Sequence, residues 1–276
     1  MRTRIISDLH LGHTASRLQS VAMLDPILDG VDHLILAGDV WQQQKVGVGF
    51  GDARSLFQEL LWLAKKRGVL VETLRGNHDP DSGKGVAWLA DGAVLVTHGD
   101  AIYDDATPWS REIGRYREEI NVLIQKYAPQ SHSAEACSER AREIALTLKA
   151  ISLPKLPSPF DFLVTALWPL NRSFEMLRVW QGMGEQGLRF LNHSGKGACV
   201  LICGHFHRPG IWQKEGKVMI NTGAFMQGSK PWAVDVNDGK LTARELVLCG
   251  DKFGLGGVKG RWILQRSLAL SSEQKT

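Results

Sequence analysis

Polar side chains that can bind metal ions occur in five short clusters along this chain of 276 residues. The clusters are Asp8-Leu9-His10, Gly38-Asp39, Gly76-Asn77-His78-Asp79, His98-Gly99-Asp100 and Gly204-His205-Phe206-His207. Their carboxylates, imidazoles and amide oxygen suit hard or borderline divalent cations, and no cluster holds a thiolate that would select a soft one. We therefore predict a site for two divalent metal ions, manganese first, with iron, zinc, cobalt or nickel as alternatives.

Each cluster directly follows a short apolar run that is typical of a buried strand. The runs cover residues 4–6, 34–37, 69–74, 93–97 and 199–203. Ligands of open α/β sheets bind outside the carboxyl ends of the strands, so we expect the clusters to meet at one edge. In extended chain, residues two apart point the same way, which would bring Asp8 beside His10 and His205 beside His207.

Each cluster also has an ordinary interpretation when it is taken alone. A glycine-aspartate pair after a strand is usually a turn, and Asn77-His78-Asp79-Pro80 has the composition of one. Two nearby histidines are often surface or core residues. Glycine is also common in plain turns, although Gly38, Gly76, Gly99 and Gly204 adjoin the proposed ligands and would permit close approach there. The order of all five clusters after five strand-like runs favours a site.

With these motifs the chain resembles the calcineurin-like metallophosphoesterases over about residues 1–100 and 195–250. The resemblance implies a four-layer α/β/β/α sandwich with a dinuclear metal site. It implies that Asp8, His10 and His207 hold one metal, that Asn77, His98 and His205 hold the other, and that Asp39 bridges both. It also implies that His78 faces the scissile phosphate while Asp79 orients its ring. Trp41 and Gln42 stand where purple acid phosphatases place a metal-binding tyrosine, so the chain departs from that subgroup.

The reaction expected of such a site is hydrolysis of a phosphoester or pyrophosphate bond. Two cations about 3.5–4 Å apart can hold a phosphoryl oxygen, neutralise its charge and ionise a bridging water, so that the bridging hydroxide attacks without a covalent enzyme intermediate. His78 is the candidate general acid. The alternatives are a phosphodiesterase or phosphatase acting on another small molecule or a phosphoprotein. A hypothesis from another class is a non-catalytic scaffold on the same fold, which degenerate ligands would indicate.

A narrower resemblance concerns the substrate. The start Ser7-Asp8-Leu9-His10-Leu11-Gly12, the pair Asp104-Asp105, a helical insertion and the motif that ends in Arg208-Pro209 resemble UDP-diacylglucosamine pyrophosphohydrolases, which hold acyl chains with their insertion. Those enzymes usually carry arginine where this chain has His78. A lipid-nucleotide substrate is therefore one hypothesis beside a simpler phosphorylated molecule.

Composition sets the class of protein. A content of 43% hydrophobic residues is ample for a core in one domain with an elaboration. The net charge of +4, with no block of five basic residues, argues against a nucleic-acid groove. Because the first strand starts at once and no apolar run has the length of a membrane span, we expect a cytoplasmic protein without a transmembrane segment.

Between residues 104 and 195 the pattern becomes helical and defines an insertion in a domain of residues 1–250. Helices are expected after Pro108, over about 134–150 and over about 173–192, with a proline-rich break at 153–159 and an apolar stretch that includes Phe160, Phe162 and Trp168. The insertion could be a subdomain that packs on itself, a lid that binds substrate, or a peripheral membrane contact. Glycines at 182, 184 and 187 indicate a hinge or a close packing contact.

The carboxyl-terminal part contains four runs expected as antiparallel strands, at 211–213, 218–221, 232–236 and 241–248. Turns are predicted at Glu215-Gly216 and Asn237-Asp238-Gly239, and the four strands should complete the second sheet. Residues 251–276 are expected to form an appendage with a frayed end.

Overall fold

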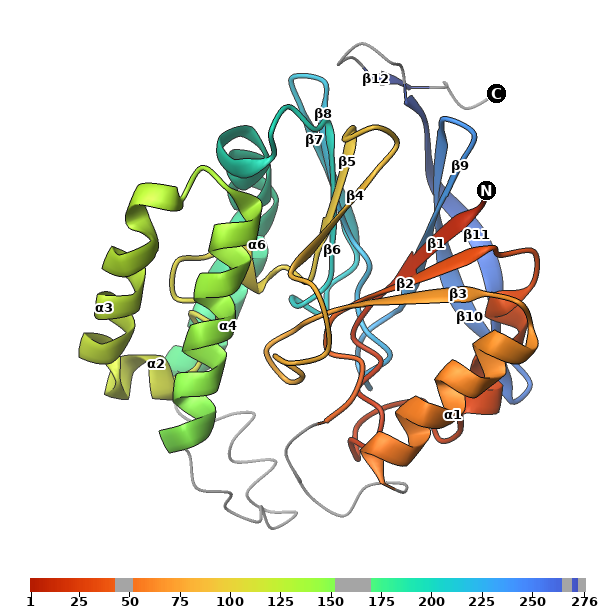
Figure 1. The fold of residues 1–276 in the computed structure, drawn as a ribbon, viewed down its shortest axis with the longest axis horizontal. Helices are drawn as coiled ribbons and strands as arrows, with labels where there is room; N and C mark the ends of the chain where they lie inside the picture. The colour runs from red at the N-terminus through yellow and green to blue at the C-terminus, as the bar shows by residue number, and fades with distance from the viewer. Residues whose placement is uncertain (43–51, 152–169, 265–269, 273–276) are drawn as a thin grey trace.

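The computed structural model describes residues 1–42, 52–151, 170–264 and 270–272. Within these residues the chain forms two β-sheets, packed face to face with helices on both outer faces (Figure 1). The predicted α/β class with two sheets is confirmed. The proline-rich break at 153–159 and the apolar stretch from Phe160 to Trp168 lie outside the described residues.

The larger sheet has seven strands and the smaller one has five. The larger runs in the order β12 (Leu270–Ser272), β11 (Lys252–Leu264), β10 (Lys240–Cys249), β9 (Trp232–Asn237), β1 (Thr3–Ile6), β2 (His33–Ala37) and β3 (Leu70–Leu74). The smaller runs in the order β4 (Val86–Leu89), β5 (Val94–Thr97), β6 (Val200–Cys203), β8 (Lys217–Asn221) and β7 (Gly210–Lys214). All five runs that precede a polar cluster are therefore strands.

The core between the sheets is built by aliphatic side chains from the facing strands. Ile5 and Ile35 of the larger sheet pack in one cluster with Val96, Ile202 and Ile220 of the smaller sheet. These strands are buried on both faces, which explains why they appear in the sequence as continuous apolar runs rather than alternating ones.

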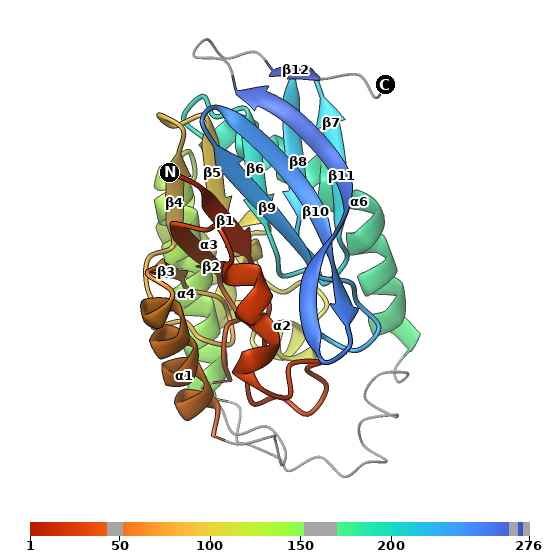
Figure 2. The same ribbon diagram turned by 90° about the vertical axis from the view of Figure 1, so that its right-hand side faces the viewer.

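Helices cover the outer face of the larger sheet. The 3-10 helix η1 (Val21–Leu28) and α1 (Ala53–Lys66) pack there through Leu24, Ile27 and Leu60. Asp52 directly precedes helix α1 and caps it, because its carboxylate accepts a hydrogen bond from the Ser55 N–H at 3.0 Å. Figure 2 shows α1 and η1 together beside strands β1 to β3.

The predicted insertion forms the helical layer on the smaller sheet. Helices α4 (Ala134–Ile151) and α6 (Leu170–Ser194) contribute Cys137, Met183 and Leu191 to a cluster with Leu95 and Leu201 of that sheet. Helices α2 (Arg111–Arg115) and α3 (Arg117–Tyr127) pack on α4 farther out. The short 3-10 helix η2 (Asp100–Ile102) lies between β5 and α2, and η3 (Ala128–Gln130) lies between α3 and α4. The described part of the insertion thus completes the four-layer α/β/β/α arrangement by packing on the sheet.

Glycines of α6 take part in this packing. The helix continues through positions 182, 184 and 187 without a break, and a Cβ at Gly184 or Gly187 would overlap Trp212 or Met219 of the smaller sheet. Of the two predicted explanations, close packing is the one that the structure supports at these two positions. A Cβ at Gly182 would meet open space.

Two expectations about the carboxyl-terminal part are wrong. The four predicted strands divide between the sheets, because β7 and β8 extend the smaller sheet while β9 and β10 pair beside β1 in the larger one. Residues 252–264 are no appendage, since they form strand β11 along β10, and its Phe253 and Trp262 are buried. The turns at Glu215-Gly216 and Asp238-Gly239 are confirmed, both with two successive positive φ angles.

Candidate metal centre

The five clusters meet at the carboxyl ends of β1, β2, β3, β5 and β6. Backbone hydrogen bonds join them: the Asp8 N–H donates to the Gly38 carbonyl at 3.1 Å, and the Gly204 N–H donates to the His98 carbonyl at 2.7 Å. The His205 N–H donates to the carboxylate of Asp8 at 3.0 Å and so links the two sheets. Asp8 and His205, 197 positions apart in the sequence, are therefore joined at one site.

A first group of donors combines Asp8, His10, Asp39 and His207, whose ligand atoms all lie within 4.8 Å of one another. The His207 Nε2 atom lies 3.2 Å from Asp8 Oδ1 and 3.1 Å from His10 Nε2. Two carboxylates and two imidazoles at these separations form a set that could hold one divalent cation.

A second group combines Asp39, His98 and His205, again within 4.8 Å of one another. The amide oxygen of Asn77 lies 3.2 Å from His98 Nε2, which in turn lies 3.2 Å from His205 Nδ1. Every predicted ligand therefore lies in one of two adjacent groups.

Asp39 belongs to both groups. Its Oδ2 atom lies 3.8 Å from His10 Nε2 and 3.4 Å from His98 Nε2, while Oδ1 accepts a hydrogen bond from the His78 N–H at 2.8 Å. The same carboxylate oxygen thus faces the donors of both groups, which is the position that a bridging ligand would require.

The backbone brings the paired donors together in a way that differs from the sequence-based expectation. Asp8, His10, Asp39, His205 and His207 all have positive φ angles between 48° and 70°, so they are not in extended chain. The strands β1 and β6 end before them, at Ile6 and Cys203. Their convergence results from left-handed turns, which aspartate and histidine adopt more readily than most residues with a side chain.

Two glycines allow these loops to touch. A Cβ at Gly204 would overlap the carboxylate of Asp8, and a Cβ at Gly76 would overlap Asp39. Only a residue without a side chain can occupy either position while the carboxylate stays in place.

Backbone carbonyl groups orient the two buried imidazoles of the second group. His98 Nδ1 lies 3.1 Å from the Ala37 carbonyl oxygen, and His205 Nε2 lies 3.0 Å from the Ala106 carbonyl oxygen. A proton on each of these nitrogens leaves His98 Nε2 and His205 Nδ1, which lie 3.2 Å apart, free to coordinate a cation. The donor set therefore fits a metal in its tautomers as well as in its residue types.

The electrostatics of the site also suit cations. Burial lowers the pKa of His10 and of His205 well below the usual value, so both rings are neutral. Burial raises the pKa of Asp39, but His98 and its neighbours outweigh burial and hold that pKa well below its usual value. Burial lowers the pKa of His98, whereas Asp39 raises it to well above the usual value. Cations would compete with the proton that His98 and Asp39 attract between them.

Asp79 has a different role from the predicted one. We expected it to orient the ring of His78, but its two oxygens accept hydrogen bonds from the N–H groups of Asp39, Val40 and Gly76 at 2.8–3.0 Å. Burial, followed by the charge of Asp39, raises the Asp79 pKa to about 7. Asp79 therefore holds the loop that carries Asp39.

The ring of His78 instead contacts Gln42, with 3.0 Å between His78 Nδ1 and Gln42 Oε1. The His78 side chain is 42% exposed, and its Nε2 lies 4.0 Å from Asp39 Oδ2. His78 is thus at the open side of the metal groups, where a substrate could reach it.

Gln42, Ala106 and Trp109 also contact the candidate ligands, and no role was predicted for them from the sequence. The Trp109 ring lies 4.9 Å from that of His205. For Gln42 a signal was available, namely a polar residue three positions after Asp39. The contact of the Ala106 carbonyl could not be predicted from the sequence, because every residue has a backbone carbonyl group.

Helix α6 passes close to the last cluster. The Trp180 indole N–H donates to the Phe206 carbonyl at 2.9 Å, and the guanidinium of Arg208 lies 5.7 Å from the centre of the Trp180 ring. One to two turns earlier on α6, Phe174 and Leu177 are 67% and 49% exposed. The insertion therefore borders the metal groups and presents apolar side chains nearby.

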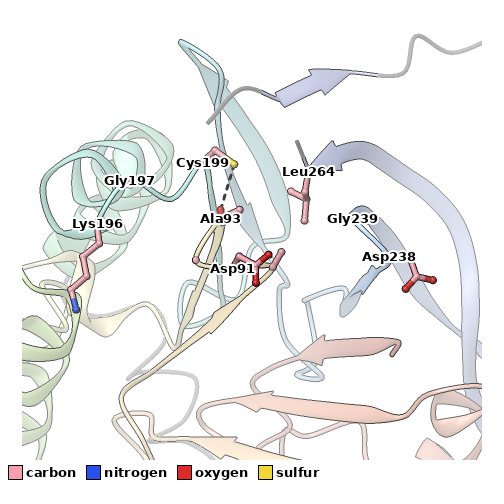
Figure 3. Close-up of a pocket in the computed structure, with 10 residues that line it drawn as sticks. Asp91, Ala93, Lys196, Gly197, Cys199, Asp238, Gly239 and Leu264 are labelled. Atoms are coloured by element: carbon pink, nitrogen blue, oxygen red, sulfur yellow. Dashed lines mark hydrogen bonds between the residues drawn. The ribbon is translucent and has the colours of Figure 1, made fainter. Parts of the chain in front are cut away.

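A hollow of about 660 Å³ lies at the other end of the strands (Figure 3). It is lined by residues that precede β5 and β6, including Ala93 and Cys199, and by the turn at Asp238-Gly239. Its charged groups Asp91, Lys196 and Asp238 extend from separate turns and do not converge as the donors of the metal groups do. We therefore place the functional site at the two groups of candidate metal ligands.

Among the described helices, none combines the length and the apolar character needed to span a bilayer.

No protein-family model and no curated protein matches the chain. Solved structures that are similar to it include a Vps29 mutant from Entamoeba histolytica, at 16% identity and a TM-score of 0.44, covering 93% of this chain and 97% of that one. The phosphoesterase YfcE from E. coli has 14% identity and a TM-score of 0.42, covering 96% and 100%. Similarities of this size place the chain in no family.

Proposed function

We propose that this protein is a metal-dependent phosphoesterase with a dinuclear centre. The observation that carries the proposal is the position of Asp39, whose Oδ2 atom faces the donors of both groups. Asp8, His10 and His207 would hold one cation with Asp39, and Asn77, His98 and His205 the other. When bound, two divalent cations neutralise phosphoryl charge and make a water molecule more acidic. The resemblance of the five motifs to calcineurin-like metallophosphoesterases supports the same conclusion.

The residues of the chain then have separate tasks. Asp39 and its neighbours bind and space the cations, Asp79 holds the Asp39 loop through the backbone N–H groups of Asp39 and Val40, and the left-handed turns keep the donors in reach. His78, at the open side, would donate a proton or a hydrogen bond to the phosphoryl group or the leaving group.

The test compares the wild type with Asp39→Asn and with Asp91→Asn, an exposed control at the far end of the strands. We expect the wild type and the control to bind divalent cations in metal analysis and to release nitrophenol from phosphate mono- or diesters with added manganese. Asp39→Asn should lose both properties, because both cations lose a shared ligand. A wild type that binds no divalent cation and hydrolyses no ester would contradict the proposal and favour the scaffold.

For the substrate, we propose an acylated nucleotide pyrophosphate, with other small phosphoesters, phosphodiesters or a phosphoprotein as alternatives. Exposed Phe174 and Leu177 on α6, which borders the last cluster, support an acyl-binding role of the insertion and a contact with the membrane surface where such a lipid resides. A hydrolysis screen should show preference for UDP-diacylglucosamine over soluble esters, and this preference should fall in Phe174→Ser. Activity on soluble esters alone would exclude the lipid substrate and leave the phosphoesterase proposal intact.

A further inference from the structure

Gln42 lies between two imidazoles that have different tasks in the proposed function. Its amide nitrogen is 3.0 Å from His10 Nδ1, and its amide oxygen is 3.0 Å from His78 Nδ1. The side chain is buried, and the two ring centroids lie 5.1 Å apart. Both polar ends of one amide are thus engaged by a candidate metal ligand and by the candidate general acid.

If His10 binds a cation, the Gln42 amide can face in only one direction. The Nε2 atom of His10 lies 3.1 Å from His207 Nε2 and 3.8 Å from Asp39 Oδ2, so Nε2 is the atom that would coordinate. A coordinating Nε2 needs its lone pair, which places the ring proton on Nδ1. Nδ1–H then needs an acceptor, and a half-turn of the amide supplies the Gln42 oxygen.

The same half-turn places the amide N–H₂ against His78 Nδ1. An N–H donor there requires the lone pair on Nδ1, so the proton of the neutral ring must be on Nε2. The Nε2 atom is the one that faces Asp39, at 4.0 Å from its Oδ2. His78 would therefore present an N–H donor toward the space where a phosphoryl group binds.

We propose that Gln42 is a positioning residue that couples cation binding at His10 to the tautomer of His78. With a cation held by His10, Gln42 accepts a hydrogen bond from His10 Nδ1–H and donates one to His78 Nδ1, which leaves Nε2–H of His78 directed at the substrate. The inference rests on the proposed function for the cation and for the role of His78. It adds a residue to that mechanism and selects one of the two tasks proposed for His78. The neutral ring donates a hydrogen bond from Nε2–H to the phosphoryl group and keeps its proton, because losing it would leave an imidazolate.

The direct test is nitrogen NMR of the histidine rings in protein loaded with Zn²⁺, a diamagnetic probe. Signals of His78 are assigned by their loss in His78→Ala. We expect His78 in the wild type to be the Nε2–H tautomer and His10 to be the Nδ1–H tautomer. An Nδ1–H tautomer of His78 in the loaded wild type would overturn the proposal.

Two variants separate the contacts of Gln42. Gln42→Met removes donor and acceptor, so we expect both His78 tautomers to be populated and Zn²⁺ affinity to fall roughly 10- to 100-fold, the usual effect of losing a partner of a ligand. Gln42→Glu keeps an acceptor for His10, so Zn²⁺ affinity should stay near that of the wild type while turnover falls. Trp41→Phe, the neighbouring position, is the control and should change neither measurement.

The outcomes distinguish this inference from the proposed function. An unchanged His78 tautomer in Gln42→Met, or equal losses of Zn²⁺ affinity in the two Gln42 variants, would contradict the role of Gln42 and leave the phosphoesterase proposal standing. A wild type that binds Zn²⁺ and shows the expected tautomers but hydrolyses no phosphoester would contradict the proposed function alone, because the NMR measurement does not depend on turnover.

Discussion

At the scale of single residues, five candidate ligands adopt the left-handed backbone conformation, which costs free energy for most residues with a side chain. Residues in the left-handed region cost of order 1–3 kcal/mol when the surroundings do not favour them. The five donors in this region are all aspartate or histidine, which adopt it more often than other residues with a side chain. The turns are held by hydrogen bonds between loops and would be held further by bound cations.

His78 provides the prediction that separates chemistry from metal binding. Because it lies at the open side and is not among the grouped ligands, His78→Ala should keep its metal but lose roughly 10²- to 10⁴-fold in turnover, the usual range for losing a general acid or a hydrogen-bond donor to the transition state. Metal analysis and initial rates measure the two effects. His132→Ala, an exposed histidine outside the five clusters, is the control. Turnover at the wild-type rate in His78→Ala would exclude the assigned role.

At the scale of elements, α6 and α4 depend on particular contacts with the smaller sheet. Gly184 lies against the Trp212 indole, whereas Gly182, half a turn earlier on the same helix, faces open space. Gly184→Ala should therefore destabilise the protein by about 1–3 kcal/mol through overpacking. Gly182→Ala should stabilise it by about 0.5–1 kcal/mol because alanine favours the helix. Urea unfolding of both variants checks the opposite signs, and equal effects would show that α6 does not pack this way.

Glu135, at the start of α4, provides a prediction about pH. It accepts hydrogen bonds from Trp88 of β4 at 3.0 Å and from Lys196 before β6 at 2.9 Å. Burial raises its pKa, but these bonds and one from Ser133 outweigh burial and lower the pKa to about 2. The folded pKa is below the unfolded value of about 4.5, so the contribution to stability is present above pH 4.5 and lost as the pH falls toward 2.

Glu135→Gln should accordingly show a weaker fall of the free energy of unfolding over that pH range. Urea unfolding at several pH values measures the slope. Glu175→Gln, an exposed position of α6, should keep the wild-type slope. The same slope in Glu135→Gln and the wild type would show that the bonds of Glu135 do not lower its pKa in the folded protein.

At the scale of the whole molecule, β11 closes the outer core of the larger sheet. Phe253 is fully buried and its ring lies 5.0 Å from that of Phe225, which follows the last candidate ligands in the sequence. Phe253→Ala should cost about 3–5 kcal/mol in the free energy of unfolding. Leu255→Ala, on the same strand at 38% exposure, should cost far less. Urea unfolding measures both losses of free energy. Equal losses in the two variants would show that β11 contributes no more to the core than the predicted appendage would.

The types of the site residues and their places after strands could be predicted from the sequence alone. The signals for both are local: a β-branched apolar run predicts a buried strand, and an aspartate or histidine directly after it can only lie at the strand end. For the same reason the helices of residues 111–127, 134–151 and 170–194 were expected close to their positions. Their packing on the smaller sheet was not, because a helical pattern does not identify the partner of its apolar face.

The tertiary structure decided what depends on contacts between distant residues. Asp39 faces both donor groups, Asp79 holds backbone N–H groups rather than His78, Gln42 joins His10 to His78, and β11 belongs to the larger sheet. These outcomes depend on left-handed turns or on contacts between residues far apart in the chain, which no local pattern specifies. The residue types thus indicate which chemistry is possible, whereas the tertiary structure determines which of these side chains lie close enough to act together.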